Sequence, residues 1–345
     1  MRILKISRGA PNDQLRALLN ENIIGTPGES LVYQQRMVNP KLDHISNPVF
    51  LTVELGDRVV GACCLVGRTV SNSGQDSPAH YIRYLTFQSR FRAPSNALQR
   101  LEKKSILKDE IAEVLSGKGL EIPEGHLFYA YVDPDNLRSK RLITSFGFEE
   151  VGRFRTVFFS RLFPKRHPKI APVKENELED IKRQLQTTYG DHCLFTTENI
   201  GFQDGYLGYY ENGELVAGLQ ANQEAWRVYE IPGGKLLLDL VSRIPLINRL
   251  FSKNFRFLSI EGVFCPEGRE GLIEVLLEDA LARSERSTAI ICLDPESDLY
   301  RKFKQLDQGL IRRLTTEKEM AVMAKGADVG HLKQHPVYIS GFDNM

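Results

Sequence analysis

The chain has 345 residues, of which 42% are hydrophobic, 26% charged and 9% aromatic, and its 45 Lys and Arg residues balance 44 Asp and Glu residues to a net charge of +1. This composition is typical of a globular protein and excludes a disordered, collagen-like or coiled-coil chain. Because positive and negative charges are so nearly balanced, there is no electrostatic argument for a nucleic-acid partner, and we expect no such partner.

The N-terminal residues lack the apolar core of a signal peptide, and no run approaches the roughly 18 apolar residues that span a membrane. The five cysteines are odd in number and include no CxxC pair: Cys63, Cys64, Cys193, Cys265 and Cys292. This pattern favours free thiols in a reducing compartment over a disulfide framework or a zinc site. We therefore expect a cytoplasmic protein that does not contact a membrane.

Local patterns in the first half predict strands and helices in a mixed order. Thr26-Pro27-Gly28-Glu29 has the hydroxyl, proline and glutamate of a capping box and predicts the start of a helix. Gly56-Asp57 predicts a tight hairpin between two strands. The predicted strands are 2–7, 50–54, 59–66, 81–87, 127–132 and a pair within 148–159, and the predicted helices are 11–22, one from 26, one from 95 or 96 to about 115, and 136–146.

The stretch Arg161–Pro172 holds three prolines and a cluster of basic residues between two regions of apolar patterning. Prolines interrupt helices and strands, so this stretch predicts a solvated linker; contact with a phosphate polymer is the alternative use of its charge. At roughly 100–200 residues per domain, the length also predicts two domains. We place them at residues 1–163 and 173–345, with the linker at 164–172.

The second half shows a similar order of elements, which indicates a tandem duplication. Lys235–Phe251 is apolar over most of its circumference and predicts a buried helix bent at Pro245, although it could also line an acyl or acceptor pocket or face a partner. The other predicted elements are a helix at 175–186, a hairpin of 206–210 and 215–220, a strand at 257–264, a helix at 272–283, a strand at 289–293, a helix near 299–304 and closing strands through 314 and 320–323.

The segment Tyr131–Phe159 resembles the closing part of the acyl-CoA N-acyltransferases of the GNAT superfamily. In that family a strand ends in an Asp- or Asn-bearing turn, a helix follows, and a Gly-Phe pair begins the last strands. Here these features are Asp133, Asn136 and Gly147-Phe148. The resemblance implies a mixed α/β fold of two tandem GNAT-like domains, each a mostly antiparallel sheet flanked by helices. It also implies acetyl-CoA or another acyl-CoA as co-substrate, with Asn136 among the cofactor-binding residues.

Family members bind the pyrophosphate of coenzyme A at a glycine-bearing loop that opens a helix, where free N–H groups attract the anion. The second half resembles this loop at Gly268-Arg269-Glu270-Gly271, although an ordinary strand-to-helix turn also favours glycines. The equivalent stretch of the first half, residues 89–95, has no glycine, and Pro94 lacks an N–H donor. The resemblance therefore points to a site in the second half, with the first half as a fold relic or an acceptor-shaping domain.

Two residues of the second half match family positions that move protons. Tyr300 lies where the family often has its general acid, and a protonated tyrosine can donate to a departing thiolate. Glu261 lies mid-strand where the family often has a carboxylate or water relay that accepts the proton of the amine; it is a useful base only if burial raises its pKa. A half-buried packing tyrosine and a solvated glutamate are the structural alternatives.

His331 and His335 are four residues apart, but Gly326, Gly330 and Pro336 around them predict a loop, and we expect no metal site. The function predicted from the resemblance is transfer of an acetyl or other short acyl group to a primary amine of a small molecule or peptide, by direct attack in a ternary complex. Two alternatives stay open: a catalytically silent GNAT-like binding module, and an aminoacyl-tRNA-dependent transferase.

Overall fold

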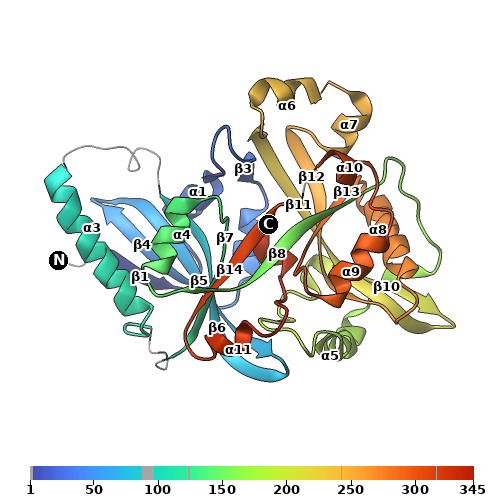
Figure 1. Ribbon diagram of the computed structural model, residues 1–345, viewed down its shortest axis with the longest axis horizontal. Helices are drawn as coiled ribbons and strands as arrows, with labels where there is room; N and C mark the ends of the chain where they lie inside the picture. The colour runs from blue at the N-terminus through green and yellow to red at the C-terminus, as the bar shows by residue number, and fades with distance from the viewer. Residues whose placement is uncertain (1–2, 88–96, 121, 123–124, 242, 316) are drawn as a thin grey trace.

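The computed structural model describes residues 3–87, 97–120, 122, 125–241, 243–315 and 317–345 (Figure 1). Its centre is one sheet of 14 strands in the order β1-β4-β5-β6-β7-β14-β8-β13-β12-β11-β10-β9, with β2 and β3 joined to its side through β11. The neighbours in this sheet are antiparallel except for β6 with β7 and β12 with β13. The predicted fold class, a mixed α/β protein with a mostly antiparallel sheet flanked by helices, is confirmed. No helix of the described residues is long and apolar enough to cross a membrane.

We call residues 3–160 the first half and residues 161–345 the second half. The elements of the first half are β1 (Leu4–Arg8), α1 (Asp13–Asn20), β2 (Ile23–Ile24), β3 (Val32–Gln35), α2 (Val38–His44), β4 (Val49–Leu55), β5 (Arg58–Asn72), β6 (Gln75–Phe87), α3 (Ala97–Val114), β7 (Leu127–Val132), α4 (Leu137–Thr144) and β8 (Glu149–Ser160). The long helix α3 lies along the outer part of the first half (Figure 1).

The elements of the second half are β9 (Ile170–Pro172), α5 (Leu178–Thr188), β10 (Tyr206–Glu211), β11 (Glu214–Glu230), α6 (Lys235–Val241), α7 (Pro245–Leu250), β12 (Asn254–Phe264), α8 (Gly271–Ser284), β13 (Thr288–Leu293), α9 (Asp298–Gln305), α10 (Leu310–Leu314), β14 (Glu319–Lys325), α11 (Val329–Leu332) and α12 (Gly341–Asn344). Short 3-10 turns precede α5 and β10.

The two halves exchange strands at the middle of the sheet. β14, from the second half, pairs with β7 and β8 of the first half, and β8 in turn pairs with β13 of the second half. Residues Ala321–Ala324 of β14 are buried, so this strand is covered on both faces. Each half therefore completes its part of the sheet with a strand from the other (Figure 1).

The capping box at Thr26 does not start a helix, and this prediction is wrong. Residues 26–30 form a turn in which the Glu29 N–H donates to the Thr26 carbonyl (3.1 Å) and Gly28 has a left-handed φ of 82°. That backbone conformation does not continue into an α-helix. The chain enters β3 instead, where Val32–Gln35 pairs with β11. Pairing with a distant strand overrides the local capping signal.

The predicted buried helix at Lys235–Phe251 is also wrong. The segment forms two short helices, α6 and α7, and Pro245 begins the second, where its missing N–H costs no hydrogen bond. Leu237, Ile244 and Leu246 are 41%, 42% and 53% exposed. Only part of the apolar surface of this insert is therefore buried against the rest of the protein. Figure 1 shows α6 and α7 on the outside of the molecule beside β11 and β12.

Both halves repeat one arrangement of strand, bulge and turn. In the first half β6 runs parallel to β7, and Tyr84 of β6 has a φ of 58°; in the second half β12 runs parallel to β13, and Gly262 has a φ of 55°. The second strand of each pair then enters a similar turn, Asp133–Asn136 after β7 and Asp294–Ser297 after β13. The last residue of each turn caps the following helix, α4 or α9.

We expect Gly309→Ala to lower the free energy of unfolding by at least about 3 kcal/mol, since a side chain there combines a strained backbone with a collision. Gly309 has a φ of 80°, and a Cβ would collide with the carbonyl oxygen of Ser160 at the end of β8. Gly213→Ala is the matched control, because its φ is 86° but no atom lies within 4 Å of its Cβ. We expect about 1–2 kcal/mol for the control. Urea unfolding measures both, and equal losses would contradict the collision.

Candidate functional site

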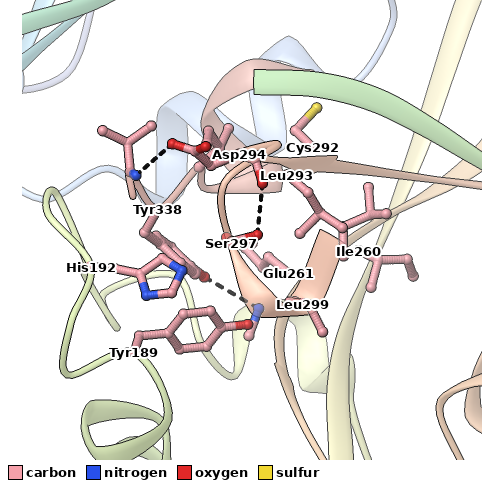
Figure 2. Close-up of a pocket in the computed structure, with 14 residues that line it drawn as sticks. Tyr189, His192, Ile260, Glu261, Cys292, Leu293, Asp294, Ser297, Leu299 and Tyr338 are labelled. Atoms are coloured by element: carbon pink, nitrogen blue, oxygen red, sulfur yellow. Dashed lines mark hydrogen bonds between the residues drawn. The ribbon is translucent and has the colours of Figure 1, made fainter. Parts of the chain in front are cut away.

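The parallel strands β12 and β13 separate after the pair Ile260–Ile291. Gly262 makes a bulge in β12 directly after this point, which bends the strand away from its neighbour. A cavity of about 20 Å³ lies where the strands part, and its lining includes Glu261, Asp294, Ser297 and Tyr338 (Figure 2). Its size allows about one water molecule, and its polar lining could bind one.

Residues near the C-terminal end of the chain fill this opening. The Val337 N–H donates to Asp294 Oδ2 (2.8 Å), and the Tyr338 N–H donates to the carbonyl of Cys193 (2.8 Å). The Tyr338 hydroxyl accepts from the Gly262 N–H at 3.2 Å (Figure 2). The opening of the second half is therefore lined and narrowed by its own chain.

Two more tyrosine hydroxyls bond to the backbone at the bulge. Tyr206 donates to the Gly262 carbonyl (2.8 Å). Tyr189 donates to the Val263 carbonyl (2.8 Å) and accepts from the Val263 N–H (3.1 Å). Together with Tyr338, they occupy backbone groups that strand separation would otherwise leave unpaired in the protein interior.

Glu261 is a buried carboxylate, with 3% of the residue exposed. It accepts hydrogen bonds from Asn222 Nδ2 (2.6 Å), the Ser340 hydroxyl (2.7 Å) and the Phe342 N–H (3.2 Å). Burial raises the pKa of Glu261, these hydrogen bonds offset part of the rise, and the resulting pKa is about 6. The predicted solvated alternative for this residue is wrong. A carboxylate that titrates this close to neutral pH can both accept and release a proton.

The short helix α12 places Asp343 in a buried cluster of charges. Its carboxylate pairs with the guanidinium groups of Arg68 and Arg83 from β5 and β6. Burial by itself would raise the pKa of Asp343, but Arg68 and Arg83 bring it below its ordinary value. Arg83 directly precedes the bulge at Tyr84, just as Glu261 directly precedes the bulge at Gly262. Opposite charges thus stand at equivalent positions of the two halves, and both contact the C-terminal segment.

A second buried ion pair lies beside this cluster. Lys41 Nζ of α2 is 2.5 Å from Glu224 Oε1 of β11 and also donates to the Phe342 carbonyl (2.9 Å). Burial lowers the pKa of Lys41, and Glu224 offsets part of that effect. Residues from both halves therefore meet around α12.

Tyr300 does not lie with Glu261. It packs in the apolar cluster between α8, α9 and the sheet together with Ile260, whereas Glu261, the next residue of the strand, contacts the C-terminal segment on the other face. The Tyr300 hydroxyl donates to Glu317 (2.6 Å) and accepts from Arg155 (3.1 Å). Its partners in this structure are thus charged side chains of β8 and the segment before β14.

The predicted phosphate loop opens α8, but its own side chains use some of its groups. The Gly268 N–H donates to the Glu270 carboxylate (3.0 Å), and hydrogen bonds from the Glu270 and Gly268 N–H groups lower the pKa of Glu270. Both terminal nitrogens of Arg269 bond to Glu211, at 2.9 and 2.8 Å. Gly271 faces open space. A carboxylate thus sits where the resemblance places an anion.

Asn136 lies in the first half, apart from the other predicted site residues. It is exposed and caps α4, accepting the Ser139 N–H at 3.0 Å. Residues 89–95, the stretch of the first half compared above with the phosphate loop, lie outside the described residues. Groups of three or more His, Cys, Asp or Glu side chains that could hold a metal ion are absent from the described part of the chain.

The sequence reasoning missed the charges around α12: Lys41, Arg68, Arg83, Glu224 and Asp343. One sequence signal could have shown which positions of the two halves are equivalent. The tetrapeptides Asp133–Asn136 and Asp294–Ser297 share an Asp-Pro-acidic-amide or hydroxyl pattern, so aligning them places the two halves in register. Nothing local predicts that Asp343 pairs with Arg68 and Arg83, which lie 275 and 260 positions earlier in the chain.

The folded chain is similar to solved structures of an N-acyltransferase. It superposes on Saccharomyces cerevisiae N-myristoyltransferase with bound myristoyl-CoA at a TM-score of 0.61 and 10% identity, covering 94% of this chain and 83% of that chain. A second structure of that enzyme gives 0.59 and 10%, over 93% and 79%. No model of a protein family matches the sequence, and neither does a curated protein. The likeness confirms the GNAT-like acyltransferase fold.

Proposed function

We propose that the chain transfers an acyl group from an acyl-CoA to a primary amine. The observation that carries the proposal is that each half has one pair of parallel strands that separates at a bulge, and that both bulges lie beside α12. Glu261 is buried next to the bulge of the second half, and Arg83 next to the bulge of the first half. The fold is shared with an enzyme that holds myristoyl-CoA in its crystal structure, which supports an acyl-CoA as co-substrate.

In this proposal the acyl-CoA enters between β6 and β7 in the first half. The matching opening of the second half is filled by Val337 and Tyr338, and tyrosine hydroxyls bond to its bulge. In the described part of the chain, by contrast, no side chain bonds to the backbone of Tyr84 or Leu85, and the Tyr84 hydroxyl is buried without a partner. Polar groups without protein partners favour a site that a ligand completes.

The reaction follows from positioning and one proton transfer. The amine nitrogen attacks the thioester carbonyl carbon, a C–N bond forms, and the C–S bond breaks to release the CoA thiolate. Glu261 accepts the amine proton, directly or through a water molecule in the cavity beside it. The thiolate takes a proton from the solvent. Tyr300, the predicted donor, has no step here because it lies on the opposite face of the sheet.

Calorimetric titration with acetyl-CoA and with myristoyl-CoA tests the proposal, with free CoA for comparison and release of thiol in the presence of peptide amines as the activity. We expect saturable binding at one site per chain, unchanged in Gly271→Trp, whose side chain would extend into open space at the predicted loop. Loss of binding in that variant would place the site in the second half. No binding of either acyl-CoA would contradict the proposal and favour a catalytically silent module.

A further inference from the structure

A second hollow of about 680 Å³ lies on the surface of the second half, away from the opened strands. Its walls come from the end of α7, the start of β12, the end of α8 and the residues around Phe163. Its volume falls in the range of pockets that hold organic ligands.

Three arginines contribute to this hollow: Arg249, Arg256 and Arg286. None of them forms an ion pair with a carboxylate in the described part of the chain. Nearby arginines behave differently: Arg283 pairs with Asp279, and Arg161 pairs with Glu274. The hollow therefore collects guanidinium groups whose charge the protein does not neutralise by direct contact.

Each of the three guanidinium groups has capacity left for an acceptor. Arg256 is exposed, and its guanidinium group makes no hydrogen bond within the described residues. Arg286 bonds to the carbonyls of Ser284 and Glu285 and to the Gln223 amide oxygen, which leaves its Nε buried without a partner. Arg249 bonds to the Ser287 hydroxyl (3.4 Å) and lies over the ring of Phe163.

The charges in the hollow also oppose one another. Burial lowers the pKa of Arg286, and the neighbouring Arg256 lowers it further. Glu285 is the acidic residue of the lining, and it offsets part of this effect. An anion placed between the guanidinium groups would remove the repulsion and supply acceptors for the free N–H groups.

The lining adds an apolar wall to these charges. Phe163 is 67% exposed and stands against Arg249 at 4.9 Å from ring centroid to guanidinium carbon. Leu250, Phe251 and Phe255 also belong to the lining. A ligand that matches both features carries an anion and an apolar or aromatic part.

We propose that this hollow binds a phosphate ester, with Arg249, Arg256 and Arg286 holding the phosphate oxygens and Phe163 contacting the organic part. Arginine suits this role because its planar guanidinium can donate two parallel hydrogen bonds to a phosphate. The phosphate comes either from a free metabolite or from the headgroup of an anionic lipid, since both present the same group.

Two probes test the site and separate the sources: titration with inorganic pyrophosphate, and sedimentation with phosphatidylcholine vesicles that contain or lack phosphatidylglycerol. The test variant is Arg256→Glu, because the Arg256 side chain is exposed and makes no hydrogen bond or ion pair within the described residues, while its backbone pairing in β12 is kept. Arg58→Glu, an exposed arginine of β5 in the first half, is the matched control.

We expect Arg256→Glu to weaken binding about tenfold or more, and Arg58→Glu to leave it unchanged, since the lost interaction is a charge-assisted hydrogen bond. Binding of pyrophosphate but not of vesicles supports a free phosphate ester. Binding to the phosphatidylglycerol vesicles that Arg256→Glu weakens supports a lipid headgroup. Equal binding by wild type and Arg256→Glu, or no binding of either probe, would overturn the proposal. Acyl-CoA titration of Arg256→Glu keeps this result separate from the proposed function.

Discussion

Replacing Glu261 by glutamine is expected to reduce the rate of acyl transfer about 10²–10⁴-fold, because the variant cannot accept the proton of the amine. Glutamine keeps the size of the side chain and can still accept from Asn222 and Phe342. The wild-type rate should rise with pH through about 6, where Glu261 ionises, and this step should be absent from the variant. Initial rates of thiol release between pH 5 and 8 measure both effects.

The same variant separates a catalytic role from a structural one. The pKa of Glu261 is higher in the folded protein than its ordinary value of 4.5, so the protonated form stabilises the fold. That stabilisation is complete below pH 4.5 and is lost as the pH rises through about 6. The loss amounts to about 2 kcal/mol for a shift from 4.5 to about 6.

Glu261→Gln lacks this loss, so its free energy of unfolding at pH 8 should not fall below that of the wild type. Glu149→Gln serves as the control, because Glu149 is exposed and pairs only with Lys333 among the side chains described. A variant that loses activity together with stability, or that keeps the pH step, would show that Glu261 is not the base.

Replacing Asp343 by asparagine is expected to lower the free energy of unfolding by about 3–5 kcal/mol at neutral pH, because it leaves the buried Arg83 without its counter-charge and leaves Arg68 only the more distant Glu198, at 3.8 Å. Asp343 pairs with Arg68 and Arg83, and all three side chains are at most 2% exposed. Urea unfolding at pH 7 measures the loss. Asp298→Asn is the control, since Asp298 pairs with Arg301 and Lys302 at the surface, where such pairs contribute little.

The pH dependence has the opposite sign to that of Glu261. The pKa of Asp343 is below its ordinary value of 3.8, so its contribution is complete above that value and is lost as the pH falls through the lowered pKa. Adding Arg83→Met to Asp343→Asn should recover part of the stability, because one unpaired charge is then removed. Equal losses in Asp343→Asn and Asp298→Asn would show that the buried cluster contributes no more than a surface pair.

The sequence alone was sufficient for elements whose signals are local. The hairpin of 206–210 and 215–220 was predicted, and Asn212 and Gly213 at its turn both take the left-handed conformation that such a turn needs. The apolar run Leu127–Val132 predicted a strand, and all but one of its residues are buried. Asp133, Asn136 and Gly147-Phe148 carried the resemblance to the GNAT fold, which the structure confirms. Each of these signals lies within a few residues of the feature that it predicts.

Part of the site could also be identified in this way. The position of Glu261, mid-strand before a glycine-bearing turn, indicated a carboxylate worth testing, and the fold buries it. Its raised pKa could not be predicted, because burial by Ser340 and Phe342 depends on residues about 80 positions later in the chain. The phosphate-binding role of the loop at Gly268–Gly271 and the proton-donating role of Tyr300 stay predictions. The side chains that bond to them include Glu211 and Arg155, which belong to distant strands, so local sequence could not show these contacts.

What only the tertiary structure decided is the centre of the molecule. The hydrophobic period of a strand sets which face is buried, but it does not select the neighbouring strand. Nothing in Glu319–Lys325 shows that it pairs with β7 and β8 of the other half. The same holds for Gly341–Asn344, a polar-looking segment whose Asp343 becomes buried only because Arg68 and Arg83 lie across from it. The sequence determined the elements and the fold class, and long-range pairing determined where the charges meet.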